Sequence, residues 1–336
     1  MAHEDTGATS VTLTSLGIGA SDPMSRFVLG CAPFGNLFAP VSDDDVFEAL
    51  ETAWDAGVRI FDTAPHYGVG LAEERLGAFL RGRERSEFVV STKVGRLLVE
   101  SDDDVSGVEG YFETPRRTRI RDYSARGVRR SIEESCERLG FASVDIALIH
   151  DPDDYERVAM NEAYPALAEL RDEGTVKAVG VGMNQVAMLE HFVTQCDIDC
   201  VLVAGRYSLL NDDAGTSFFR LCEERHVAVL VGGVFNSGVL AAPSPASTYD
   251  YQPVDAEVLE RVEAINDVCA RYGVSLPAAA MQYVLRRRTV AAVVIGARSA
   301  TEVTHDISYL QTPVPAALFD ELRWRGLIEI PRSQVA

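Results

Sequence analysis

In Phe61-Asp62-Thr63-Ala64-Pro65-His66-Tyr67-Gly68-Val69-Gly70, a short buried strand ends and a glycine-rich loop begins. The apolar run Val58–Phe61 predicts the strand. Asp62 stands where that strand ends, and Tyr67 follows five residues later in the loop. We therefore expect an acid and a phenol close together at the carboxyl end of a strand.

Similar apolar runs recur along the whole chain, with amphipathic helical stretches between them. They are rich in Val and Ile and lack the polar alternation of a half-exposed sheet, so they suit parallel strands covered on both faces. An open doubly wound sheet would alternate in the same way, but eight strands favour an α/β fold of the (β/α)8 (TIM) barrel type. We expect one barrel domain over residues 1–336. The predicted strands are Arg26–Leu29, Val58–Phe61, Phe88–Thr92, Val144–Ile149, Val176–Val181, Cys200–Ala204, Val227–Val231 and Val290–Ile295.

Two helices carry clear end signals. The first begins after Ser42, a hydroxyl cap followed by three acids that suit the positive end of a helix dipole, and ends at Gly57. The second has apolar residues at helical spacing and ends at Gly140.

Two long segments are expected to be irregular. Glu100–Asp122 has acids first and then four arginines, and it follows the third strand. In a barrel it would lie over the catalytic mouth as a lid, although a solvated insertion fits the composition equally well. Ala241–Gln252 is a second such loop, after the seventh strand, and residues 1 to about 10 are expected to be disordered.

The composition limits the classes of partner. Lys and Arg number 31 against 51 Asp and Glu, which gives a net charge of −20 and argues against nucleic acid and anionic membranes. No apolar run is long enough to span a membrane, and the N-terminus lacks the features of a signal peptide. The six cysteines form no CxxC pair and are expected to be reduced. A cytoplasmic protein is predicted, and its oligomeric state stays open.

Polar side chains also follow the next two strands. Lys93 comes directly after Phe88–Thr92, and His150 directly after Val144–Ile149. In a barrel these strand ends face the active site, so both should join Asp62 and Tyr67. A phenol has a pKa of about 10, but an adjacent ammonium stabilises the phenolate and lowers that value.

Each of the four residues then has a role. The aspartate would hold the lysine charged, and the histidine would orient a substrate oxygen. Together the four groups can protonate a carbonyl oxygen as hydride arrives, or deprotonate a hydroxyl as hydride leaves. Taken singly, an Asp, Tyr or Lys at such a place is often structural. His150-Asp151-Pro152-Asp153-Asp154 could instead bind a metal, although no second histidine follows at a strand end, and we expect no metal site.

At these residues the sequence resembles the aldo-keto reductase superfamily, from about Leu29 to Leu310. The resemblance implies a (β/α)8 barrel and a catalytic set of Asp62, Tyr67, Lys93 and His150. The matching motifs are Phe61–Ala64, Tyr67–Gly70, Glu73, Leu76-Gly77, Ser91–Gly95, Arg138–Gly140 and Val144-Asp145.

Further segments resemble the aldose 1-dehydrogenases that act on L-fucose, D-threo-aldoses or L-galactose, with pyridoxal 4-dehydrogenase close by. The resemblance implies removal of hydride from the anomeric carbon of a cyclic sugar, giving a lactone. An aldehyde reductase and a non-catalytic, cofactor-sensing regulatory subunit remain as alternatives. The matching segments are Gly30–Asn36, Lys93–Leu98, Gly180–Asn184, Ala204–Leu210 and Phe235–Gly238.

The resemblance also implies a nicotinamide cofactor, with NAD favoured over NADP. Gly296 and Glu302 stand where NADP-preferring members often have lysine and arginine, whereas Arg298 could bind a phosphate. Gly232 replaces a tyrosine that commonly stacks on the nicotinamide, so Phe235 or Tyr207 is the expected substitute. The expected cofactor contacts are Gly30, Cys31, Asn184, Arg206, Tyr207, Phe235, Asn236, Ser237, Gly238, Gly296, Ala297, Arg298, Glu302 and Asp306.

The substrate is expected to be a small sugar or aldehyde. Arg96, Arg206 and His66 lie near the mouth by position and could bind hydroxyl groups, although ion pairing or surface exposure explains them equally well. The arginines of the expected lid could attract an acidic sugar, but the resemblance favours a neutral aldose.

Overall fold

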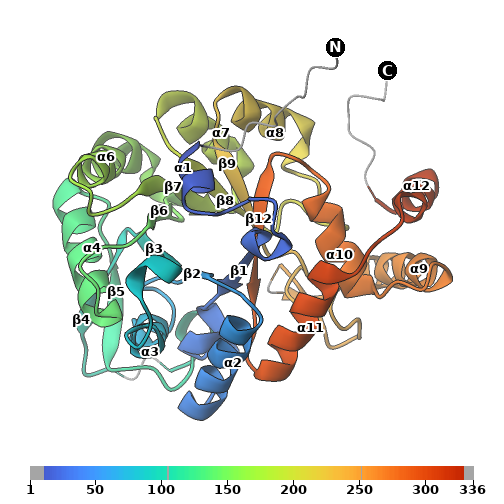
Figure 1. Cartoon of the computed structure of the whole chain (residues 1–336), viewed down its shortest axis with the longest axis horizontal. Helices are drawn as coiled ribbons and strands as arrows, with labels where there is room; N and C mark the ends of the chain where they lie inside the picture. The colour runs from blue at the N-terminus through green and yellow to red at the C-terminus, as the bar shows by residue number, and fades with distance from the viewer. Residues whose placement is uncertain (1–10, 104–105, 251, 329–336) are drawn as a thin grey trace.

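The computed structural model describes residues 11–103, 106–250 and 252–328. Its centre is a closed barrel of eight parallel strands, paired in the order β1-β12-β9-β8-β7-β6-β3-β2 (Figure 1). The eight predicted strands are confirmed, with ends displaced by two residues at most. The barrel strands are β1 (Phe27–Gly30), β2 (Ile60–Asp62), β3 (Val89–Val94), β6 (Ile146–His150), β7 (Ala178–Met183), β8 (Cys200–Ala204), β9 (Ala228–Gly232) and β12 (Val290–Gly296).

Helices surround the barrel (Figure 1). The predicted helix after Ser42 is confirmed, and the Ser42 hydroxyl accepts a hydrogen bond from the amide of Asp45 at 3.1 Å. The predicted end at Gly140 is also confirmed, where φ is +80°. The helices are α1 (Val11–Ser15), α2 (Asp43–Asp55), α3 (Leu71–Leu80), α4 (Ala125–Leu139), α5 (Glu156–Val158), α6 (Tyr164–Asp172), α7 (Val186–Gln195), α8 (Gly215–Glu224), α9 (Ala256–Arg271), α10 (Leu276–Leu285), α11 (Ala300–Gln311) and α12 (Ala316–Trp324).

Two apolar layers hold the barrel together. The larger lies between strands and helices, and the smaller fills the barrel interior with side chains such as Leu148 and Leu230. Leu13 and Ile18, in and after α1, are buried in the interior layer. The short N-terminal helix therefore covers the amino-terminal end of the barrel, and the opposite end remains for a site.

The expectation of irregular structure over Glu100–Asp122 is wrong in part. Strand β5 (Arg117–Arg121) pairs antiparallel with β4 (Arg96–Glu100), so the segment leaves and returns as a two-stranded ribbon. Four of the ten residues in the two strands are arginines, which made them look like a solvated stretch. Likewise, β10 (Thr248–Tyr249) and β11 (Gln252–Pro253) form a small hairpin at the end of the expected second loop.

Three further expectations concern the chain as a whole. All six cysteines are free thiols, as predicted, and four of them are buried. Among the described residues, no helix is long and apolar enough to cross a membrane. Residues 1–10, which we expected to be disordered, lie outside the described residues.

Candidate active site

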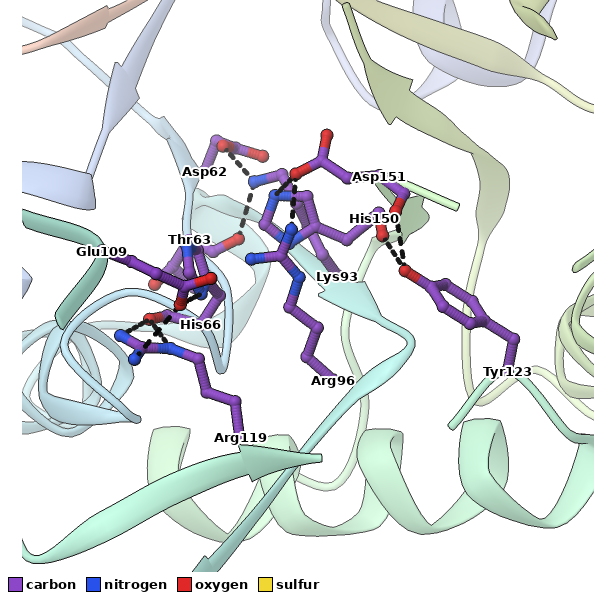
Figure 2. A network of polar contacts seen from close by, with 10 residues as sticks. All are labelled: Asp62, Thr63, His66, Lys93, Arg96, Glu109, Arg119, Tyr123, His150 and Asp151. Carbon is purple, nitrogen blue, oxygen red and sulfur yellow. Dashed lines mark hydrogen bonds and ion pairs between the residues drawn. The ribbon is translucent and has the colours of Figure 1, made fainter. Parts of the chain in front are cut away.

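A buried ion pair forms the floor of the site. Lys93 on β3 places its Nζ 2.6 Å from Oδ2 of Asp62, the last residue of β2. The same ammonium donates to the carbonyl of Thr63 at 2.9 Å (Figure 2), and Ser91 Oγ donates to the other carboxylate oxygen at 2.9 Å. The lysine and aspartate side chains are 2% and 3% exposed. Because β2 and β3 are neighbours in the barrel, the pair is fixed by strand register.

Tyr67 lies above this pair. The Lys93 Nζ is 4.6 Å from the centre of the Tyr67 ring, and the His150 ring stands edge-on to it at 5.9 Å. The loop that carries the tyrosine passes against the backbone of Gly35. A side chain at Gly35 or Gly68 would clash with the other segment, so these two glycines allow the close approach.

His150, the last residue of β6, is buried and uncharged. Burial lowers its pKa well below the ordinary value, and Arg96 and Lys93 lower it further. Burial and the same two cations, with Arg119, also lower the pKa of the neighbouring His66 to about 2. The two imidazole rings are 5.5 Å apart. Both histidines are therefore neutral hydrogen-bonding groups at physiological pH.

We expect both histidines to stay neutral as the pH falls through about 6.5, the ordinary pKa of a histidine. A histidine whose folded pKa lies below its unfolded value of about 6.5 gains no proton as the pH passes through 6.5 in the folded state. Heteronuclear NMR of imidazole nitrogens measures this directly, with His66→Asn and His150→Asn to assign the signals. Titration of either ring between pH 6 and 7 would contradict the result.

A cavity of about 660 Å³ opens above these side chains, a size that suits small-molecule ligands. Tyr67, Lys93 and His150 line it, and so does Tyr111 from the segment between β4 and β5. The Tyr111 ring stacks on Tyr67 at 6.4 Å and meets His66 edge-on at 5.3 Å.

The segment is held in place by its own ion pairs. Arg119 on β5 donates to the His66 carbonyl at 3.0 Å and pairs with Glu109 at 3.3 Å (Figure 2). Tyr111 was missed by the sequence analysis because its position depends on the pairing of β4 with β5.

Four of the expected cofactor residues line the cavity: Asn184, Arg206, Asn236 and Ser237. Arg206 also pairs with Asp250 at 2.6 Å. Asn236 is 2% exposed, and its amide oxygen and nitrogen have no hydrogen-bond partner among the described residues. A buried amide without partners costs about 1–3 kcal/mol. A nicotinamide carboxamide, which carries one acceptor and two donors, fits such a pair of groups.

The two residues expected to stack on the nicotinamide, Tyr207 and Phe235, do not line the cavity. Tyr207 packs 4.6 Å from Phe219 and accepts a hydrogen bond from Arg287, within an aromatic cluster behind the cavity wall. The aromatic cluster holds the Tyr207 ring, which does not line the cavity, and its stacking on a cofactor ring stays a prediction. Phe235 packs against the outer apolar layer and, among the described residues, is not part of the cavity lining.

The remaining expected contacts lie outside the cavity lining. Gly30 and Gly296 are register partners at the carboxyl ends of β1 and β12, and Gly238 forms a bridge with Thr248. Cys31 and Ala297 are fully buried. Glu302 and Asp306 lie on α11, where burial and then the Glu302 charge raise the Asp306 pKa to about 7. Arg298 precedes that helix.

The acidic run Asp151–Asp154 after His150 is the alternative metal site. Within residues 11–103, 106–250 and 252–328, no group of three or more His, Cys, Asp or Glu side chains is arranged to hold a metal ion.

Comparison with known proteins identifies the family of this chain. It matches the aldo/keto reductase family over residues 26–323. It is 42% identical over 309 residues to a D-threo-aldose 1-dehydrogenase of a Pseudomonas species, covering 90% of this chain and 94% of the relative. A pyridoxal 4-dehydrogenase of Microbacterium luteolum is 37% identical over 343 residues, with 96% of each chain covered.

Two more distant proteins also resemble the chain, one in sequence and one in fold. An L-galactose dehydrogenase of Arabidopsis thaliana is 27% identical over 307 residues, with 89% of this chain and 88% of the relative covered. The solved structure of a Gluconobacter oxydans glycerol dehydrogenase shares the fold, with a TM-score of 0.73 at 22% identity, over 95% of this chain and 97% of the other. The resemblance stated from the motifs is thus confirmed. The chain belongs to the aldo/keto reductase family, and it is an NAD(P)-dependent oxidoreductase.

Proposed function

We propose that the protein oxidises an aldose at C1 to the corresponding lactone, with NAD(P) as the hydride acceptor. The observation that carries the proposal is the buried Asp62–Lys93 pair beneath Tyr67, at the floor of a cavity that also contains the neutral His150. The name of the 42% identical relative, D-threo-aldose 1-dehydrogenase, supports the choice of substrate class.

In this proposal Tyr67 takes the proton from the sugar O1 hydroxyl as C1 is oxidised. Lys93 stabilises the phenolate that is needed to accept the proton, and Asp62 keeps the ammonium charged and in place. His150, neutral and buried, donates a hydrogen bond to O1 and orients it. A nicotinamide cofactor bound in the cavity would supply the hydride acceptor for this oxidation.

Two sets of residues would hold the cofactor, one in the cavity lining and one outside it. Asn184, Asn236 and Ser237 line the cavity and suit the nicotinamide end. The loop from Gly296 to Glu302 precedes and opens α11, and it suits the adenosine end.

We further propose that the segment between β4 and β5 is a lid over the substrate. Glu109, Gly110 and Tyr111 line the cavity, and Arg119 anchors the segment to the His66 carbonyl. An aromatic side chain at this place can cover one face of a sugar ring and exclude water.

The test is NADH or NADPH formation at 340 nm with a panel of aldoses that includes L-fucose and D-threo-aldoses. We expect turnover with at least one aldose, and lactone as the product. Pyridoxal and simple aldehydes, assayed in both directions, provide the comparison. Turnover of pyridoxal or aldehydes with none for any aldose would replace the proposal. Cofactor binding without turnover of any compound would favour a regulatory role.

A pyridoxal 4-dehydrogenase activity is the second candidate. The observation that favours it is the 37% identical relative of that name, which aligns over 96% of both chains. Pyridoxal also forms a cyclic hemiacetal, so the same proton transfer to Tyr67 would serve its oxidation.

We propose NAD as the preferred cofactor. Glu302 accepts hydrogen bonds from the Arg298 amide at 2.8 Å and from its guanidinium at 2.9 Å. The arginine charge is therefore already matched, and a carboxylate would oppose the 2′-phosphate of NADP.

We expect kcat/KM to favour NAD over NADP by about tenfold or more, which is about 1.4 kcal/mol. Glu302→Gln removes the opposing charge and releases Arg298, so kcat/KM for NADP should rise about tenfold while that for NAD changes little. Steady-state kinetics with both cofactors measure these values. A tenfold preference of the wild type for NADP would overturn the assignment.

A further inference from the structure

Arg96 and Asp151 form an ion pair on the wall of the cavity. The guanidinium Nη2 lies 2.8 Å from Oδ2 of the aspartate (Figure 2). Both residues line the catalytic cavity, and both also line an adjoining cavity of about 330 Å³. The pair therefore stands where the two spaces meet.

The pair has unused hydrogen-bonding capacity. Arg96 lines both cavities, and its guanidinium carries five N–H donors, of which Nη2 supplies one to Asp151. The Asp151 side chain is 35% exposed, so its carboxylate keeps lone pairs available to a ligand. A guanidinium donor beside a carboxylate acceptor can bind two neighbouring hydroxyl groups, one as acceptor and the other as donor.

The backbone holds the pair beside the proposed catalytic histidine. Asp151 has φ +41°, a conformation that a non-glycine residue rarely adopts. Its amide donates to the Gly182 carbonyl at 3.0 Å, and the Tyr123 hydroxyl donates to the carbonyls of His150 and Asp151 at 2.6 and 2.8 Å (Figure 2). The Tyr123 ring in turn packs on Gly95, where a side chain would clash with it. The Asp151 carboxylate thus lies 3.5 Å from His150 Nε2.

We propose that Arg96 and Asp151 bind the vicinal hydroxyls next to the reacting carbon and so select polyhydroxylated substrates over plain aldehydes. The inference rests on the proposed function, because His150 marks the position of the reacting oxygen. Arg96 and Asp151 would be the residues that recognise the substrate hydroxyl groups.

The surrounding charges favour a neutral ligand. In the adjoining cavity, Arg96 and Arg121 face three acids, Asp151, Asp153 and Asp154, so a phosphate or carboxylate gains little there. Two arginines of β5 are already paired, Arg117 with Glu74 and Arg119 with Glu109. A hydroxyl-rich, uncharged substrate matches this lining.

The test compares two small aldehydes in the reductive direction. Glyceraldehyde carries two vicinal hydroxyls next to the carbonyl, and propanal carries none. We expect the wild type to favour glyceraldehyde by about tenfold or more in kcat/KM, corrected for hydration of each aldehyde. Arg96→Gln and Asp151→Asn should each lower this ratio about tenfold, through glyceraldehyde alone. Arg117→Gln, which breaks an ion pair between β5 and Glu74 of α3 outside the cavity lining, should leave the ratio unchanged.

The outcomes separate this inference from the proposed function. An equal loss for both aldehydes in the variants shows that the pair only positions His150, and it overturns the inference. A wild-type ratio near one, an unchanged ratio in the variants, or no reduction of either aldehyde also overturns it. If no aldose is oxidised but the ratio behaves as expected, the proposed function fails and the hydroxyl-binding pair stands.

Discussion

Tyr67→Phe should lower kcat by about two to four orders of magnitude, the range of general acid–base catalysis. The substitution removes one hydroxyl and leaves the ring in contact with the Lys93 ammonium and the Tyr111 ring. Cofactor binding should stay within about threefold of the wild type, because the residues proposed to hold the nicotinamide are unchanged. Stopped-flow turnover and cofactor fluorescence titration measure the two quantities separately.

A second tyrosine provides the control. Tyr164 lies at the start of α6, and its hydroxyl accepts a hydrogen bond from the Asp197 amide at 2.9 Å, remote from the cavity. Tyr164→Phe removes the same group and should leave kcat within about threefold. Near-wild-type turnover by Tyr67→Phe would show that another group carries the proton.

Lys93→Met should reduce both turnover and stability. The substitution leaves the Asp62 carboxylate buried, with the Ser91 hydroxyl as its remaining side-chain partner. Removing one partner of a buried pair costs about 3–5 kcal/mol, because the other charge is left uncompensated. Turnover should fall about a hundredfold or more, since the phenolate of Tyr67 loses its stabilising cation. Chemical denaturation and steady-state kinetics on the same preparation provide both values.

The double variant Asp62→Asn/Lys93→Met separates the two effects. It removes both charges, so most of the lost free energy of unfolding should return while turnover stays low. If the double variant is no more stable than Lys93→Met, the buried charge is not the cause of the loss. If either variant keeps its turnover, Lys93 does not support the proton transfer.

The barrel was predictable because its signal is local. Eight apolar runs, each too short for a helix and flanked by helical periodicity, define the strands without knowledge of their partners. Asp62, Lys93 and His150 could be placed together because parallel strands in a barrel present their carboxyl ends on one face. Both predictions therefore require only the sequence of single segments and one rule of barrel topology.

The features that were missed depend on contacts between distant segments. The β4–β5 ribbon requires Arg96 and Arg121 to pair across the loop, and nothing in either strand alone specifies this. Tyr207 has the sequence context of a cavity residue, but its ring packs against Phe219 of α8.

The cofactor loop shows a similar limit. Taken singly, Arg298 favours NADP and Glu302 favours NAD, whereas in the structure they form one i,i+4 ion pair. Their combined charge, rather than either residue alone, faces the ribose end of a cofactor in our proposal.

The most direct test of C1 oxidation by this site is NMR of an aldose labelled with ¹³C at C1, incubated with NAD. L-Fucose and the D-threo-aldoses are the sugars to label first. We expect the anomeric signals to be replaced by one lactone carbonyl signal, in a one-to-one ratio with NADH, and we expect Tyr67→Phe to abolish the change on the same time scale. Anomeric signals that persist for every aldose tested, or lactone formation at the wild-type rate by Tyr67→Phe, would contradict it.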